Sequence, residues 1–122
     1  MKYEDNILAQ KSMEFAVRIV KLFKHLTEND HNYVLPNQIL RSGTSIGANI
    51  FEGINAQTKP DFLTKINIAL KEATETEYWL NILVRTDYIT KKEFDSLERD
   101  LDEIKRLLVS TVKTTKNNLS KE

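Results

Sequence analysis

The chain has 122 residues, no cysteine, and eighteen basic side chains balanced by eighteen acidic ones. This length predicts one domain with one hydrophobic core. The absence of cysteine excludes disulfides and thiolate metal sites and fits a cytoplasmic protein. A net charge of zero argues against indiscriminate nucleic-acid binding, and no apolar run is long enough to predict a membrane-spanning helix.

The first predicted helix covers about residues 6–26 and carries two parallel apolar seams. One seam, with 4-3-4-3-4 spacing, consists of Leu8, Ser12, Phe15, Ile19, Leu22 and Leu26. The second, beside it, consists of Ala9, Met13, Ala16, Val20 and Phe23. Together they cover about half of the helix circumference, which is more than one partner helix can bury.

The second predicted helix covers about residues 36–56, with Pro36 in its first turn, where a missing N–H is harmless. Gly43 and Gly47 lie on its apolar side, where each lowers helix propensity by roughly 1 kcal/mol. Two such glycines in a helix indicate that another backbone comes close. A narrow polar stripe on the opposite side consists of Arg41, Ser45, Asn49 and Glu52.

Two further helices are predicted at about residues 59–86 and 91–115, because each follows an N-terminal capping pattern. Thr58 with Asp61 opens the third helix, and Thr90 with Glu93 opens the fourth. The last residues, TTKNNLSKE, lose the apolar seam and are expected to fray. Four amphipathic helices with short connections predict an all-α protein, an antiparallel up-down-up-down four-helix bundle in a single domain.

Two stretches resemble the 23S rRNA-intervening sequence protein family. The first runs from Leu35 to Gly53 and the second from Asp61 to Leu83. The matching residues are Pro36, Gln38, Arg41, Ser45, Asn49, Glu52, Gly53, Ala69, Glu75 and Glu77. The chain departs from the family pattern at Lys71 and Glu72, where many members have a small Gly-Ser pair, and this indicates a subgroup.

The resemblance implies a bacterial four-helix bundle without a settled biochemical activity. Relatives of this family accompany the reverse transcriptases of diversity-generating retroelements and assemble as rings of five. A homo-oligomer, with a pentamer favoured, is therefore implied, together with an RNA, DNA or reverse-transcriptase-type partner.

The polar stripe has two interpretations. Arg41, Ser45, Asn49 and Glu52 could form a binding surface. They could equally fix helix register, with Glu75 or Glu77 opposite Arg41, since arginine–carboxylate pairs specify one packing among several. The structural interpretation is favoured because no nucleophile or acid–base pair accompanies the set. We therefore expect no enzyme, no cofactor and no small-molecule substrate.

Two motif-like patterns do not predict sites. Glu28 and His31 have the spacing of a di-iron ligand pair, but they occur once and in a loop, so no metal is expected. The segment from Gly43 to Gly47 lacks the lysine of a phosphate-binding loop and lies within a helix.

Basic side chains form stripes that could follow a nucleic-acid backbone or could be ordinary solvated helix faces. The candidate contacts are Lys105, Arg106, Lys113 and Lys116 on the fourth helix and Lys11 and Arg18 on the first.

An oligomer interface is expected where apolar residues lie outside the core seams. The candidates are Trp79, Ile68, Ile82, Met13 and Val20. Two functions remain open: an oligomeric adaptor that binds RNA or a nucleic-acid-processing partner, and a structural or regulatory protein-binding bundle with no nucleic-acid role.

Overall fold

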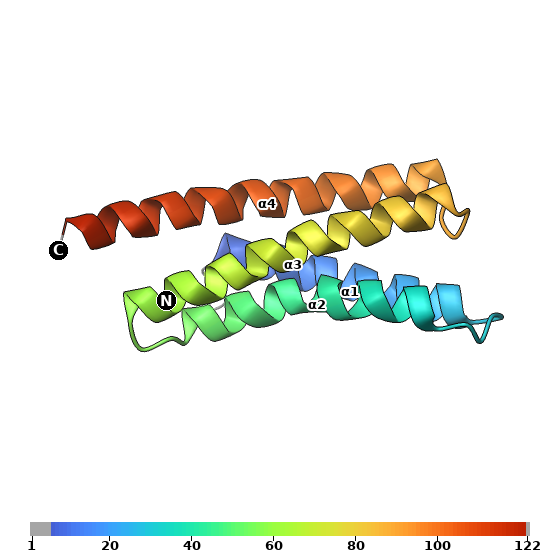
Figure 1. Cartoon of the computed structure of the whole chain (residues 1–122), viewed down its shortest axis with the longest axis horizontal. Coiled ribbons are helices and arrows are strands. Elements are labelled where there is room, and N and C mark those ends of the chain that lie inside the picture. The colour runs from blue at the N-terminus through green and yellow to red at the C-terminus, as the bar shows by residue number, and fades with distance from the viewer. Residues whose placement is uncertain (1–5, 122) are drawn as a thin grey trace.

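The computed structural model describes residues 6–121, and this range forms four helices (Figure 1). They are α1 (Ile7–Thr27), α2 (Val34–Ile54), α3 (Lys59–Arg85) and α4 (Lys91–Ser120). Successive helices run in opposite directions, which confirms the predicted antiparallel four-helix bundle. Each helix packs against the next along the chain, and a smaller contact between α4 and α1 closes the bundle.

Local signals in the sequence explain where three of the helices begin. The side chain of Asn6 accepts a hydrogen bond from the backbone N–H of Ala9 at 3.0 Å, and α1 follows. Thr58 likewise caps α3. Thr90 and Glu93 form a complete capping box at α4, each side chain accepting from the other residue's backbone N–H. Such caps satisfy backbone donors that have no partner within the helix.

The prediction that α4 ends near residue 115 is wrong, because the helix continues to Ser120. Thr115 is buried, and Leu119, one turn later, is partly buried and extends the apolar seam. The Thr115 hydroxyl also donates to the carbonyl of Thr111 at 2.8 Å, a bond that keeps the polar side chain compatible with the helix. The end of α4 projects beyond the other helices in Figure 1.

The turn between α3 and α4 uses a left-handed residue. Asp87 has a φ of 64° and follows the end of α3. The N–H of Tyr88 donates to the carbonyl of Leu83 at 2.9 Å, which closes the Schellman arrangement that helices use at their C-termini. Aspartate tolerates this backbone better than most residues other than glycine.

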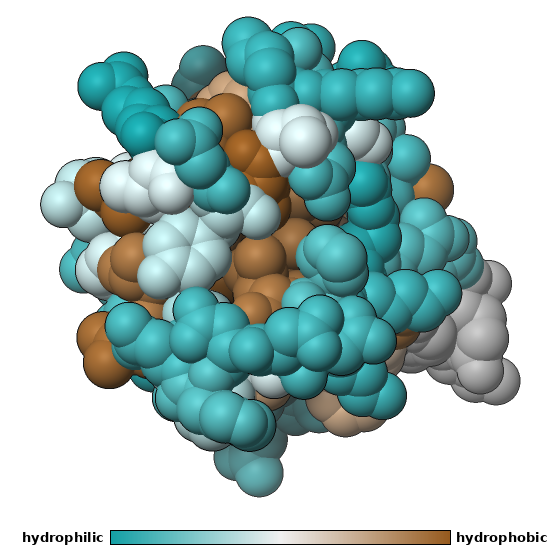
Figure 2. Space-filling view, turned by 90° about the vertical axis from the view of Figure 1, so that its right-hand side faces the viewer, coloured by the Kyte–Doolittle hydropathy of each residue, from teal (hydrophilic) through white to brown (hydrophobic). Residues whose placement is uncertain are grey.

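The core consists of one apolar side chain row from each helix. Its largest fully buried members are Phe15, Ile19, Ile39, Ile46, Ile50, Ile66, Leu80, Leu83, Leu101, Ile104 and Leu108. Figure 2 shows the end of the bundle with the α1–α2 and α3–α4 connections, where hydrophilic side chains surround a hydrophobic centre. Two buried hydroxyls, Ser42 and Thr76, are hydrogen-bonded to each other at 3.0 Å and link α2 to α3 inside the core.

Gly43 and Gly47 lie on the side of α2 that packs against α1. A Cβ atom on Gly43 would lie 2.9 Å from two side-chain carbons of Ile19, which is fully buried. A Cβ atom on Gly47 would lie 3.3 Å from the hydroxyl oxygen of Ser12 and 3.4 Å from its carbonyl oxygen. At Gly43 the space for a side chain is already filled, and at Gly47 the contact with Ser12 is tight, so both glycines favour the approach of α2 to α1.

Replacing Gly43 tests this packing. We expect Gly43→Leu to lower the free energy of unfolding by roughly 1–3 kcal/mol or more, because overpacking outweighs the gain in helix propensity of at most about 1 kcal/mol. Thermal unfolding followed by circular dichroism measures the change. The control is Asn37→Leu at an exposed position of the same helix, which should alter stability by about 0.5 kcal/mol or less. A higher melting temperature in Gly43→Leu would contradict the packing account.

Candidate functional site

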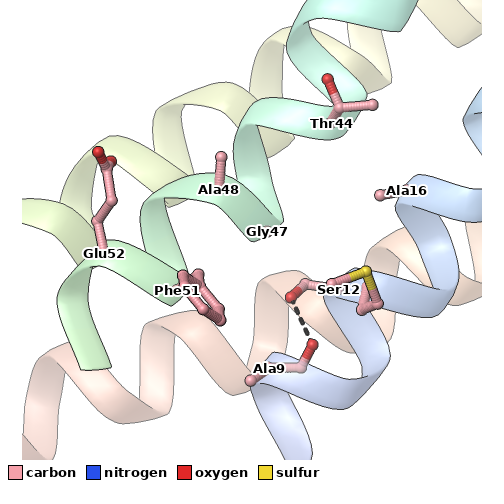
Figure 3. A pocket seen from close by; sticks show the side chains of 9 residues that line it. Ala9, Ser12, Ala16, Thr44, Gly47, Ala48, Phe51 and Glu52 are labelled. Carbon is pink, nitrogen blue, oxygen red and sulfur yellow. Dashed lines mark hydrogen bonds between the residues drawn. The ribbon is translucent and has the colours of Figure 1, made fainter. Parts of the chain in front are cut away.

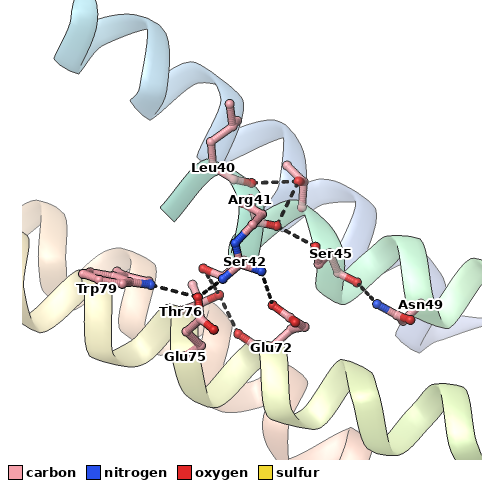
Figure 4. Close-up of polar contacts among 10 residues, drawn as sticks. Leu40, Arg41, Ser42, Ser45, Asn49, Glu72, Glu75, Thr76 and Trp79 are labelled. Carbon is pink, nitrogen blue, oxygen red and sulfur yellow. Dashed lines mark hydrogen bonds and ion pairs between the residues drawn. The ribbon is translucent and has the colours of Figure 1, made fainter. Parts of the chain in front are cut away.

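The polar stripe of α2 lies along its outer seam with α3 (Figure 4). The guanidinium of Arg41 pairs with the carboxylates of Glu72, at 3.3 Å, and Glu75. The same Glu75 oxygen accepts a hydrogen bond from the indole N–H of Trp79 at 3.0 Å. At the other end of the stripe, Glu52 lies 3.5 Å from the ammonium of Lys65.

The middle of the stripe bonds to its own helix. The hydroxyl of Ser45 donates to the carbonyl of Arg41 at 2.7 Å, and the amide of Asn49 donates to the carbonyl of Ser45 at 2.8 Å. These side chains therefore do not connect α2 to α3. Only the charged ends of the stripe reach across the seam.

The order of the charges matches an antiparallel pairing in one register. Arg41 and Glu52 are eleven residues apart on α2, and Lys65 and Glu75 are ten apart on α3. At 1.5 Å per residue these separations are about 16 Å and 15 Å, so both ends pair at once. A shift of one turn would lose the contact between Glu52 and Lys65, whereas Arg41 would still meet Glu72. The geometry therefore supports the structural interpretation of the stripe.

Of the two carboxylates considered for Arg41, the structure brings Glu75 to it. Glu77 lies on the other side of α3, 3.4 Å from the ammonium of Lys105 on α4. Glu72 was not expected as a partner, although it lies three residues before Glu75 and so on the same helix face. The three-residue spacing of Glu72 and Glu75 could therefore have predicted Glu72 as a second partner of Arg41.

A double-mutant cycle tests the link between the helices. Arg41→Gln and Glu75→Gln should show a coupling of roughly 0.5–1 kcal/mol in unfolding free energy, because the Arg41 side chain is 52% exposed and surface pairs are weak. The coupling should shrink in high salt. A parallel cycle on Lys91 and Asp95, an exposed pair within α4, gives the reference for a pair that joins no helices. Additive single changes at low salt would contradict the register role.

The bundle leaves one apolar side of α1 uncovered. This outer seam of α1 consists of Met13, Val17 and Val20. Met13, Val17 and Val20 are 46%, 45% and 37% exposed, whereas the inner seam from Leu8 to Leu22 is buried. Beside it lies a groove of about 480 Å³ between α1 and α2 (Figure 3). Its lining consists of Ala9, Ser12, Met13, Ala16, Thr44, Gly47, Ala48, Phe51 and Glu52.

Phe51 of α2 belongs to this surface. Its side chain is 51% exposed and leans towards Ala9 of α1 at one end of the groove. The small residues in the lining leave the groove open. The exposed apolar area of α1 and α2 is therefore one continuous surface.

Three of the five expected interface residues lie elsewhere. Trp79, Ile68 and Ile82 are only partly exposed, and Trp79 packs against the core. Its ring also meets that of Tyr78 edge-on, with centroids 5.1 Å apart. The structure places Met13 and Val20 on the uncovered face of α1, but it gives Trp79 partners within its own chain.

Most of the candidate nucleic-acid contacts are neutralised by ion pairs. Lys11 lies 2.9 Å from Glu103, and Arg18 lies 2.5 Å from Asp100. Lys105 pairs with Glu77, and Arg106 pairs with Asp102 one turn earlier on α4. Within residues 6–121, Lys113 and Lys116 are exposed and have no ion-pair partner. Among the six candidates, unpaired positive charge is thus confined to Lys113 and Lys116 near the end of α4.

Metal-ligating side chains do not gather in the part of the chain that the structure describes, where no group of three or more could hold a metal ion. The hydrogen bond of His31 is to the hydroxyl of Tyr33, at 3.0 Å, rather than to a carboxylate. None of the described helices combines the length and the apolar character needed to cross a membrane.

Fold and surfaces together define a small antiparallel four-helix bundle with an uncovered apolar face on α1. The chain belongs to the 23S rRNA-intervening sequence protein family, whose model matches residues 4–110. It is also similar to the crystal structure of a protein of unknown function from the S23 ribosomal protein family of Bacteroides thetaiotaomicron. The two are 55% identical with a TM-score of 0.85, and the match covers 88% of this chain and 99% of that one. No curated protein gives a significant match.

Proposed function

We propose that this protein is a non-enzymatic, homo-oligomeric adaptor of the cytoplasm that binds RNA or a nucleic-acid-processing protein. The observation that carries the proposal is the uncovered outer seam of α1. Contiguous apolar surface on a small protein marks an interaction site, because water contact with it is unfavourable. A second copy of the chain is the partner that the family resemblance suggests.

The width of the apolar surface favours a ring over a simple pair. The inner seam of α1 is used within the bundle, and the outer seam continues into the groove that Phe51 borders. A neighbour on each side could cover such a face as helices gather around a central axis. A ring of five is the assembly that we propose.

Light scattering after gel filtration tests the oligomer. The wild type should have a mass several times that of the 14.2 kDa chain. Met13→Glu should shift it towards the monomer, because burying an unpaired carboxylate in an apolar interface is costly. The matched control is Val109→Glu, since Val109 is 40% exposed on α4, away from the groove. A monomeric wild type at micromolar concentration would rule out the oligomer.

Nucleic-acid binding, in this proposal, uses the last turns of α4. Lys113 and Lys116 carry free charge there, and the helix end projects from the bundle. Contacts with phosphate release counterions and need no base-specific side chains. The alternative, a structural or regulatory bundle that binds only protein, is favoured by the ion pairs that neutralise four of the six candidate basic residues.

A charge reversal separates these alternatives. The double change Lys113→Glu and Lys116→Glu should abolish binding to single-stranded RNA at low salt while leaving helicity and oligomer mass unchanged. Removing one lysine should lower the slope of log affinity against log salt by about one unit. Lys21→Glu with Lys24→Glu, on exposed positions of α1, is the control and should retain binding. If the wild type binds no RNA at low salt, the protein-only alternative stands.

A further inference from the structure

A carboxylate cluster lies at the contact between α3 and α4, apart from the surfaces described above. Glu98 of α4 is within hydrogen-bonding reach of Glu77 of α3. The Oε2 atom of Glu98 is buried and, among residues 6–121, has no hydrogen-bond partner. A buried carboxylate oxygen without a donor is costly, whereas a protonated carboxyl could donate to its neighbour.

The surrounding charges compensate the pair only in part. Lys105 lies on the same stripe of α4, and its ammonium is 3.4 Å from Glu77. Asp102 adds a third negative charge on that stripe. The basic groups that α1 directs at α4 are engaged on another side of the helix, where Lys11 pairs with Glu103 and Arg18 with Asp100. Arg106 pairs with Asp102, so Lys105 alone is left to compensate Glu77 and Glu98.

We propose that Glu98 carries a proton and donates a hydrogen bond to Glu77, so that these two side chains form a pH-sensitive clamp between α3 and α4. In the protonated state the carboxyl of Glu98 donates to the carboxylate of Glu77 across the helix contact. Loss of the proton leaves two like charges side by side and weakens the attachment of α4. The clamp is independent of oligomerisation and of nucleic-acid binding.

The same neighbours determine the pKa of Glu98. Burial, followed by the hydrogen bond and the negative charge of Glu77, raises the pKa of Glu98 to about 7, and Lys105 opposes the rise. In the unfolded chain the same group has its ordinary pKa of 4.5. Between these values the folded protein binds more protons than the unfolded one. Stability from this group is therefore full below about pH 4.5 and is lost as the pH rises through about 7.

The direct test is a carbon-13 NMR titration of the glutamate carboxyls in the wild-type protein. The Glu98 signal should have its midpoint near pH 7. A midpoint of about 5 or lower, in the range of ordinary glutamates, would overturn the proposal. This measurement needs no variant and so does not depend on how a substitution folds.

Thermal unfolding of Glu98→Gln gives the second test. The wild type should melt roughly 3–6 °C lower at pH 8 than at pH 5. Glu98→Gln should lose this dependence and melt above the wild type at pH 8, because its amide donates without ionising. The control, Glu103→Gln, removes a carboxylate on another side of α4 and should keep the wild-type dependence. An unchanged pH dependence in Glu98→Gln would contradict the clamp.

Discussion

The close approach of α1 and α2 is the contact on which the rest of the structure depends. It requires that Gly43 have no side chain, because the γ carbons of Ile19 occupy that space. With the helices so near, the inner seam of α1 fills the core completely. The outer seam then has no helix of its own chain to cover it. The same helix thus has a packed inner side and an exposed apolar side.

The polar contact between α2 and α3, made by the ion pairs of Arg41 and Glu52, has a different role. Its ion pairs are largely exposed and contribute little free energy, but the pair of Glu52 with Lys65 is made only in the observed antiparallel register. The buried hydrogen bond between Ser42 and Thr76 supports the same register from inside the core. Apolar packing stabilises this pair of helices, and polar contacts select its alignment.

Periodicity within one helix predicted most of the architecture. The inner seam of α1 and the capping box of Thr90 and Glu93 could be read directly, since both depend on residues close in sequence. Contacts between helices were harder to predict. The partner of Arg41 could be narrowed only to Glu75 or Glu77, because choosing between them requires the rotation of α3.

Charge stripes were the least predictable feature for the same reason. Lys11 and Arg18 look available along α1, yet acidic residues of α4 neutralise them. The unusual position of Glu98 also depends on its neighbour on another helix. The exposure of Phe51 also depends on another helix. Phe51 borders a groove between α1 and α2, because the small residues around it leave space.

The order of contacts along the chain has a consequence for how the bundle folds. Among the four main helix–helix contacts of the described residues, three join consecutive helices. The fourth and smallest, between α1 and α4, joins helices that are not consecutive. The average loop to be closed is therefore short, and low contact order is typical of proteins that fold within microseconds to milliseconds. Docking of α4 on α1 closes the longest loop for the least buried surface. Amide hydrogens of α4 should accordingly exchange through local opening before those of the other three helices.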